Sequence, residues 1–98
     1  MIYDYTLEEM IQVKESYFSS LDPVVLSVFP AKEKKKYIAL QIIKTVFQPN
    51  ITYTEKEVSS ILKEVYFDFV TLRRYLVDYH YLLREKDGSA YWVNEELI

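Results

Sequence analysis

The chain contains a single glycine, Gly88, which follows Asp87 between two short apolar runs. A chain so poor in glycine lacks the tight turns of a β-sandwich and the composition of a flexible linker. Half of its 98 residues are hydrophobic and only three are proline, and this length suits a single core. We therefore expect one regular, mainly helical domain with one glycine-dependent β-hairpin.

Cysteine is absent from the sequence, and His80 is its one histidine. The absence of cysteine excludes disulfides, zinc thiolates and thiol nucleophiles. His80 has no second histidine with which to form a metal site, and the sequence contains no glycine-rich phosphate loop, nucleophile elbow or dinucleotide fingerprint. We therefore expect no catalytic residues, no metal and no cofactor, and a protein that is not an enzyme.

Charge is distributed unevenly along the chain. Residues 1–30 carry a net charge of −4, residues 31–86 carry +4 and residues 87–98 carry −3. The basic middle segment permits an anionic partner despite the overall charge of −3, because local potential steers association. No apolar run approaches the roughly 20 residues of a membrane span, and the N-terminus is acidic, unlike a signal peptide. We expect a cytoplasmic protein without a membrane partner.

Two helical segments are predicted in the N-terminal third. Thr6 and Glu9 fit a capping box, and the apolar spacing that follows predicts a helix ending at about Ser19. Proline after aspartate is typical of a helix start, which predicts one or two helical turns over residues 23–28. The apolar side of the first helix covers either its own core or a second copy of the chain. For a homodimer, the candidate interface residues are Leu7, Met10, Ile11, Tyr17 and Phe18.

The rest of the chain alternates helical patterns with short extended runs. Residues 31–47 predict a central helix, and residues 51–53 predict a short strand. A capping box at Thr54 opens a helix through Val65, and Asp68 is the expected cap of a helix ending near Tyr79. Helix, strand, helix, turn and helix therefore follow one another before the hairpin.

The C-terminal hairpin is predicted by two strand-like runs, residues 82–86 and 89–93, around Asp87-Gly88. This dipeptide is typical of a primed two-residue turn. Tyr91 and Trp92 should then lie on opposite faces of the second strand.

This element order is that of a winged helix-turn-helix domain. The expected fold class is α+β and mainly α, with an additional N-terminal helix and a C-terminal β-hairpin wing. We expect an N-terminal helical extension over residues 1–28 and a winged-helix-like domain over residues 29–98, forming one compact unit. Element order is shared by DNA-binding proteins and by protein-interaction modules, so it determines fold more firmly than function.

Long motifs in the second part of the chain resemble a bacterial domain-of-unknown-function family, number 2087. The motifs are Phe29-Pro30-Ala31-Lys32, Tyr53-Thr54-Glu55-Lys56-Glu57-Val58, Thr71-Leu72-Arg73-Arg74-Tyr75-Leu76-Val77-Asp78-Tyr79 and Asp87-Gly88-Ser89. The resemblance implies a winged-helix-like domain of the kind described in transcriptional regulators, with no established ligand or reaction. Residues 1–21 lie outside it, and His80 stands where the family more often has glycine.

In the helix over residues 68–79, helical spacing points Arg74 outward and leaves Arg73 at a border. The leading hypothesis is a transcriptional regulator whose recognition helix enters the major groove of double-stranded DNA, while nearby lysines contact phosphates. The candidate DNA-binding residues are Thr71, Arg73, Arg74, Lys32, Lys35, Lys36 and Lys86.

Each of these candidates has a structural alternative. Arg73 could instead pair with an acid such as Glu57 or Asp68, and the lysines could form a solvated surface. Glu85 and Asp87 lie at the hairpin tip, and their negative charges oppose a contact between the wing and DNA. Asp78 repels phosphate on the outward helix face, and the apolar Val70 and Val77 suit a protein partner. The alternative function is therefore a winged-helix interaction or dimerisation module that does not bind DNA.

Overall fold

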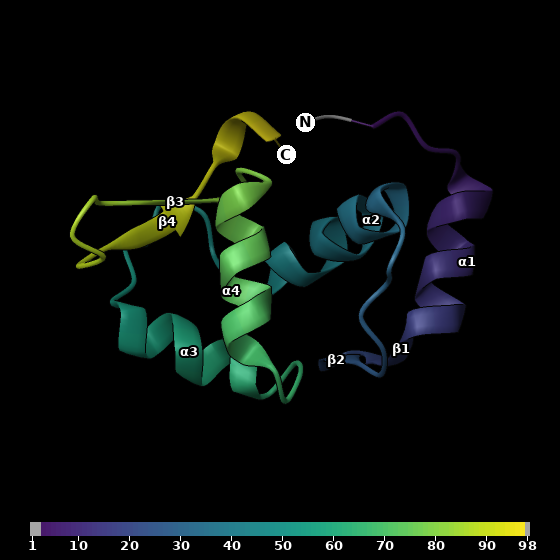
Figure 1. Ribbon diagram of the computed structural model, residues 1–98, viewed down its shortest axis with the longest axis horizontal. Helices are drawn as coiled ribbons and strands as arrows, with labels where there is room; N and C mark the ends of the chain where they lie inside the picture. The colour runs from purple at the N-terminus through teal and green to yellow at the C-terminus, as the bar shows by residue number, and fades with distance from the viewer. Residues whose placement is uncertain (1–2, 98) are drawn as a thin grey trace.

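The computed structural model describes residues 3–97; residues 1, 2 and 98, which the predicted segments 1–28 and 29–98 include, lie outside the described part. The described chain has an α+β fold with four α-helices and two small antiparallel hairpins. It measures 37 × 25 × 22 Å along its principal axes (Figure 1). None of the helices within residues 3–97 has the length and apolar character that crossing a membrane requires.

Helix α1 (Leu7–Tyr17) begins at the predicted capping box. Thr6 accepts a hydrogen bond from the Glu9 N–H, and Glu9 accepts one from the Thr6 N–H. The helix ends two residues before the predicted Ser19, because Phe18 is already extended and starts a strand.

The segment after α1 is a β-hairpin, so the short helix predicted over residues 23–28 is wrong. Strand β1 (Phe18–Leu21) pairs antiparallel with β2 (Val24–Leu26). Asp22 and Pro23 form the turn between the strands, and the β-branched valines that follow suit extended backbone. The Leu26 N–H then donates to the Val65 carbonyl at 2.8 Å, which holds the hairpin to a distant part of the chain.

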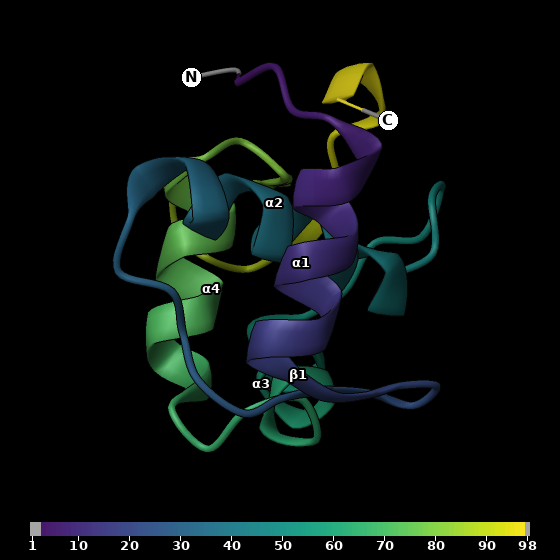
Figure 2. The same cartoon turned by 90° about the vertical axis from the view of Figure 1, so that its right-hand side faces the viewer.

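Helix α2 (Glu33–Ile43) is central, as predicted from its broad apolar arc, and it lies between α1 and α4 in both views (Figures 1 and 2). It is shorter than the predicted 31–47 because Lys32 is an extended N-cap and Lys44–Val46 tightens into the 3₁₀ turn η1. Its buried residues are Tyr37, Ile38, Ala39, Leu40, Ile42 and Ile43.

Helices α3 (Glu55–Lys63) and α4 (Phe69–Asp78) form next to each other, as predicted. Thr54 caps α3 in a reciprocal box with Glu57. Asp68 caps α4 by accepting a hydrogen bond from the Thr71 N–H. The apolar stripes meet in the core, where the fully buried side chains of the two helices are Val58, Leu62, Leu72 and Leu76.

The C-terminal hairpin pairs β3 (Leu82–Arg84) with β4 (Tyr91–Val93). The predicted primed two-residue turn is wrong. The last pair of the ladder is Arg84 and Tyr91, and beyond it the Glu85 N–H donates to the Ala90 carbonyl at 2.9 Å. The Glu85 carbonyl accepts from the Gly88 N–H at 2.9 Å, so the turn proper spans Glu85 to Gly88. Gly88 has a positive φ of 76°, which glycine adopts without strain. Tyr91 is buried and Trp92 is partly exposed, which confirms their opposite faces.

One isolated β-bridge and one short turn complete the C-terminal half. The predicted strand over residues 51–53 reduces to one bridging residue, Tyr53, which exchanges two 2.8 Å backbone hydrogen bonds with Tyr91. The turn η2 (Glu95–Leu97) follows β4. A single core joins both halves of the chain, since Val13 and Phe18 cluster with the buried residues of α2, α3 and α4.

Candidate nucleic-acid interface

Helix α4 presents the faces predicted from its spacing. Leu72 and Leu76 are fully buried, whereas Arg74 and Asp78 are exposed and Val70 is 50% exposed. The outward face therefore offers one cation, one anion and one apolar side chain in successive turns.

Thr71 is partly committed to the start of α4. Its hydroxyl donates to Asp68 Oδ2 at 2.7 Å, and its backbone N–H donates to Asp68 Oδ1 at 3.3 Å. The same carboxylate satisfies two donors, as expected for an N-cap aspartate. Thr71 therefore lies at the N-terminal end of the helix, where recognition helices contact bases, but its hydroxyl already has a partner.

Arg73 is held by α3. Its Nη1 donates to Ser59 Oγ at 2.6 Å, and its Nη2 lies 3.2 Å from Glu55 Oε1. Pairing with an acid was one of the two interpretations of Arg73, but the expected partners Glu57 and Asp68 are wrong. Both of those carboxylates cap helices, which leaves Glu55 to receive the guanidinium. The Arg73 side chain retains 20% exposure.

A groove of about 330 Å³ runs between α4, the start of α3 and the C-terminal hairpin. Three arginines and two acids contribute to its lining, together with apolar side chains. The lining residues are Glu55, Val70, Arg73, Arg74, Val77, Asp78, Arg84 and Tyr91. The groove thus collects arginines from two separate elements beside the outward face of α4.

The lysines at the start of α2 have different environments. Lys32 is exposed at the N-cap and Lys35 lies 5.8 Å from the Tyr17 ring centroid. Lys36 reaches α4, where its Nζ lies 4.8 Å from the Tyr75 ring centroid and donates to the Tyr75 hydroxyl at 3.4 Å. Lys36 therefore connects the lysine-rich end of α2 to the border of α4.

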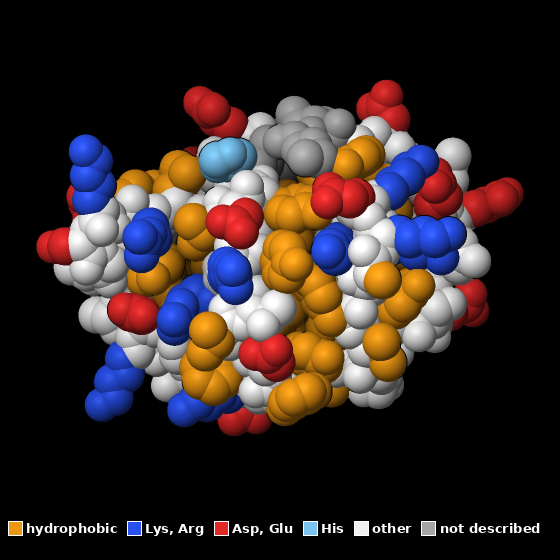
Figure 3. All heavy atoms as spheres, viewed as in Figure 1, with side chains coloured by type: hydrophobic (Ala, Val, Ile, Leu, Met, Phe, Trp, Pro, Cys, Tyr) orange, Lys and Arg blue, Asp and Glu red, His pale blue; other side chains and the backbone are white. Residues whose placement is uncertain are grey.

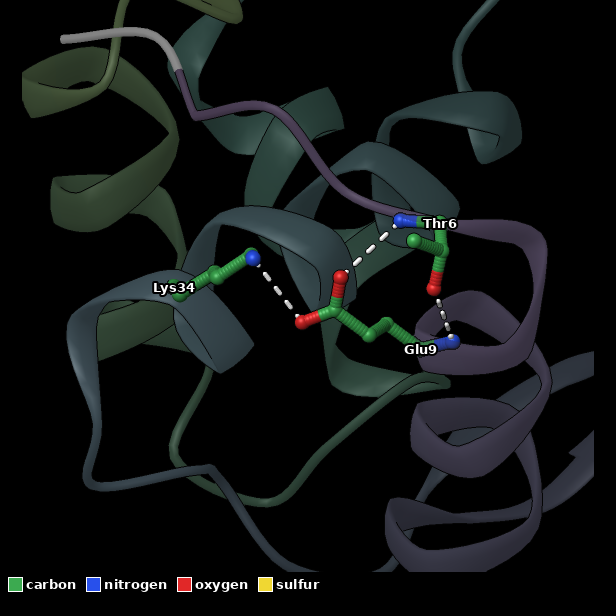
Figure 4. A network of polar contacts seen from close by, with 3 residues as sticks. All are labelled: Thr6, Glu9 and Lys34. Atoms are coloured by element: carbon green, nitrogen blue, oxygen red, sulfur yellow. Dashed lines mark hydrogen bonds and ion pairs between the residues drawn. The ribbon is translucent and has the colours of Figure 1, made fainter.

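Lys34 is engaged by α1. Its Nζ lies 2.9 Å from Glu9 Oε2, while the other oxygen of the same carboxylate accepts from the Thr6 N–H (Figure 4). The contacts with Lys34 and with Thr6 lower the pKa of Glu9 below its usual value. One carboxylate thus caps α1 and neutralises one of the four lysines at the start of α2.

The basic side chains of both elements share one face of the molecule. Figure 3 shows two groups of Lys and Arg, one over α4 and the hairpin and one toward α2 and α1, with hydrophobic side chains between them. Phe29, which precedes α2, also stacks on Tyr75 of α4 at 5.1 Å between ring centroids. The resulting surface has cations on both sides of a central apolar strip.

The hairpin tip carries mixed charge. Lys86 is exposed, but so are its neighbours Glu85 and Asp87. Asp87 accepts a 2.9 Å hydrogen bond from the Ser89 N–H, and its contacts with Ser89 lower the pKa of the Asp87 carboxyl. Asp87 therefore stays negative beside Lys86 and weakens any attraction of the tip for phosphate.

The candidate interface residues of the N-terminal segment separate into two groups. Phe18 is buried, and Met10 and Tyr17 pack against the core of their own chain. Leu7 and Ile11 are 75% and 45% exposed. Val13, absent from the predicted stripe, is the buried residue of α1, so the helix is rotated relative to the expected face. Leu7 and Ile11 are therefore the most accessible of the five candidates.

Two exposed residues near α4 were not among the sequence candidates. Phe67 is 83% exposed in the turn before α4, and Arg84 lines the groove from β3. Strand alternation places Arg84 on the same face as the buried Leu82, but it does not reveal that Arg84 lies beside α4. No sequence signal distinguished Phe67 from a core aromatic.

Comparison with known families supports the resemblance. A family described as "Uncharacterized protein conserved in bacteria" (DUF2087) matches residues 25–93. No curated protein and no solved structure gives a significant match. Within residues 3–97, no group of three or more His, Cys, Asp or Glu residues is placed to hold a metal ion. Because the match spans well over half of the chain, this protein belongs to the DUF2087 family.

Proposed function

We propose that this protein is a winged helix-turn-helix domain that binds double-stranded DNA in transcriptional regulation, with α4 as the recognition helix. The observation that carries the proposal is the placement of cations on both sides of the exposed face of α4. Arg74 projects from that face, Arg73 and Arg84 line the groove on one side, and the lysines at the start of α2 flank the other.

The element order supports this assignment. α3 and α4 are joined by a short connection, and the β3–β4 hairpin follows in the position of a wing. In such motifs the second helix lies in the major groove and its N-terminal residues contact base edges. Asp78 is the last residue of α4, and its carboxylate would repel phosphate. We therefore expect the contacts with DNA to concentrate on the N-terminal half of α4.

Fluorescence anisotropy with a generic labelled duplex, measured over a range of salt concentrations, tests the proposal. We expect binding that weakens steeply with salt, because each neutralised phosphate releases counterions. Arg74→Ala should weaken binding and reduce the salt slope by about one unit. The matched control is Asp78→Asn, which removes the opposite charge one turn away and should strengthen binding. No binding at about 50 mM salt, or identical affinities for both variants, would contradict the proposal.

The lysines offer a second matched pair. Lys32→Gln should lower affinity and the salt slope, since Lys32 is exposed at the start of α2. Lys34→Gln should change them less, because the Lys34 ammonium is already paired with Glu9. Equal effects of the two substitutions would show that the ion pair does not restrain Lys34 in the complex.

The exposed apolar residues favour a second candidate, a protein-interaction module that forms a homodimer. Phe67 and Val70 are 83% and 50% exposed at the start of α4, and aromatic side chains such as that of Phe67 are enriched at protein interfaces. Size-exclusion chromatography with light scattering should then show a dimer that Phe67→Ser converts to a monomer. A monomeric wild-type protein at high concentration would exclude this candidate.

A further inference from the structure

Glu55 lies in the groove beside α4, although its carboxylate has no part in the cap of α3. The capping box of that helix uses Thr54 and Glu57, and Glu55 is the first helical residue. It lines the groove instead, together with three arginines. An acid in the first turn of a helix gains only a small energy from the helix dipole. The needs of the helix therefore do not explain why an acid stands among the arginines.

The two oxygens of the Glu55 carboxylate contact different elements. Oε1 lies 3.2 Å from Arg73 Nη2 of α4, and Nη1 of the same guanidinium donates to Ser59 Oγ at 2.6 Å. Oε2 lies against the hairpin turn, where a methyl group at Gly88 would place its carbon 3.6 Å from Glu55 Oε2 and 3.6 Å from Arg84 Nη1. The carboxylate is thus paired with one arginine of the groove and lies near a second one.

The Arg73 guanidinium can bind a phosphate group with the same donors that now hold this carboxylate. Arginine recognises carboxylates and phosphates through one set of N–H groups, in a planar geometry that suits both. A competitor can reach the ion pair, because the side chains of Arg73 and Glu55 are 20% and 51% exposed. Ion pairs in contact with water contribute little net free energy, so an incoming phosphate displaces the carboxylate at low cost.

We propose that Glu55 is an autoinhibitory acid that competes with phosphate groups for Arg73 in this groove. The inference rests on the proposed function, in which the competing phosphates belong to the DNA backbone. When a duplex binds, the Arg73 guanidinium exchanges the Glu55 carboxylate for a phosphate oxygen. Glu55 therefore lowers the affinity of the groove for every DNA sequence, because the exchange involves no base.

Fluorescence anisotropy of the full chain with a generic labelled duplex tests this competition. Glu55→Gln should strengthen binding by about threefold, the size expected when a weak, exposed ion pair no longer opposes the contact. The salt slope should also steepen by about one unit, because Arg73 then neutralises a phosphate without leaving an unpaired acid beside it.

Glu57→Gln is the matched control. It removes the same charge from the same helical turn, and its amide oxygen can still accept the hydrogen bond from the Thr54 N–H. Glu57 lines a different hollow, on another side of α3 from the arginine groove. Glu57→Gln should therefore strengthen duplex binding less than Glu55→Gln does.

A second background separates competition from net charge. In the Arg73→Gln protein no guanidinium remains for Glu55 to occupy, so Glu55→Gln should strengthen duplex binding less there than in the wild-type background. Equal gains in the two backgrounds, or equal gains from Glu55→Gln and Glu57→Gln, would show that Glu55 acts through net charge alone. Either result would overturn the proposal.

Inorganic phosphate provides a test without DNA. NMR signals of the arginine side-chain N–H groups should report phosphate binding at Arg73, with half-saturation at about threefold lower phosphate concentration in Glu55→Gln than in the wild type. If the duplex binds and Glu55→Gln changes neither titration, the autoinhibition is refuted while the proposed function stands. If no variant binds the duplex, the proposed function fails, and equal half-saturation by phosphate in the two proteins then refutes the inference as well.

Discussion

Helices α1 and α4 have nearly the same length and both begin with a side-chain cap, but they bury their apolar residues to very different extents. In α4, Leu72 and Leu76 are fully buried. In α1, Val13 is buried while Leu7 is 75% exposed. The comparison shows that local signals are enough to start a helix, whereas the neighbours around it determine how much of its apolar surface leaves water.

The largest expected effect is on stability, and it comes from replacing a leucine by alanine in each of the two helices. Leu72→Ala should lower the free energy of unfolding by about 3 kcal/mol, because it leaves a cavity in the core. Leu7→Ala should lower it by less than about 0.5 kcal/mol, because Leu7 faces solvent. Urea unfolding measures both. A large loss from Leu7→Ala would mean that another chain covers α1 in solution.

The second effect concerns the contact that joins the two regions. The hydroxyls of Tyr79, next to α4, and Tyr3, before α1, both donate to Glu33 Oε2, at 3.2 and 3.1 Å. Burial, reinforced by the Glu33 carboxylate, raises the pKa of Tyr79 to about 12. The folded state therefore favours the neutral phenol, and its contribution is complete below pH 10 and is lost as pH rises toward about 12.

Unfolding measured in urea across this pH range should show a stability loss from Tyr79 of roughly 1 to 2 kcal/mol. Tyr79→Phe removes the ionisable hydroxyl, so the alkaline loss should be smaller in this variant even though its stability at neutral pH is lower. If the free energy of unfolding falls equally steeply with rising pH in wild type and variant, Tyr79 does not control the alkaline loss of stability.

The smallest effect tests whether the two regions differ in their caps. Asp68→Ala removes the side-chain cap of α4 and Thr6→Ala removes that of α1, and each should cost about 1 kcal/mol. Equal losses in urea unfolding would locate the difference between the regions in packing alone. If Thr6→Ala leaves the free energy of unfolding unchanged, α1 unfolds locally before the rest of the chain. The two helices would then also differ in how cooperatively they unfold with the core.

Local sequence signals predicted the C-terminal half well. The capping box at Thr54, the Asp68 cap and the outward position of Arg74 follow from the spacing of a few neighbouring residues. The β1–β2 hairpin was missed because β2 is three residues long, too short to show a period. Its anchor, the Val65 carbonyl, lies far along the chain, where no local pattern indicates it.

The candidate site was predictable as a set of residues but not as a set of contacts. The lysines and arginines are evident in the sequence, whereas the pairing of Arg73 with Glu55 depends on which carboxylates already cap helices. The partner of Lys34 lies on another helix, Glu9 in α1.

The two backbone hydrogen bonds between Tyr53 and Tyr91 have an evolutionary consequence. They join main-chain groups, so every residue except proline can make both of them. The chain that contains α3 and α4 is thereby closed into a loop whose two junction hydrogen bonds do not depend on the chemistry of any side chain. The surface of the helix pair can therefore diversify among descendants of this sequence while the hairpin stays attached at the same place.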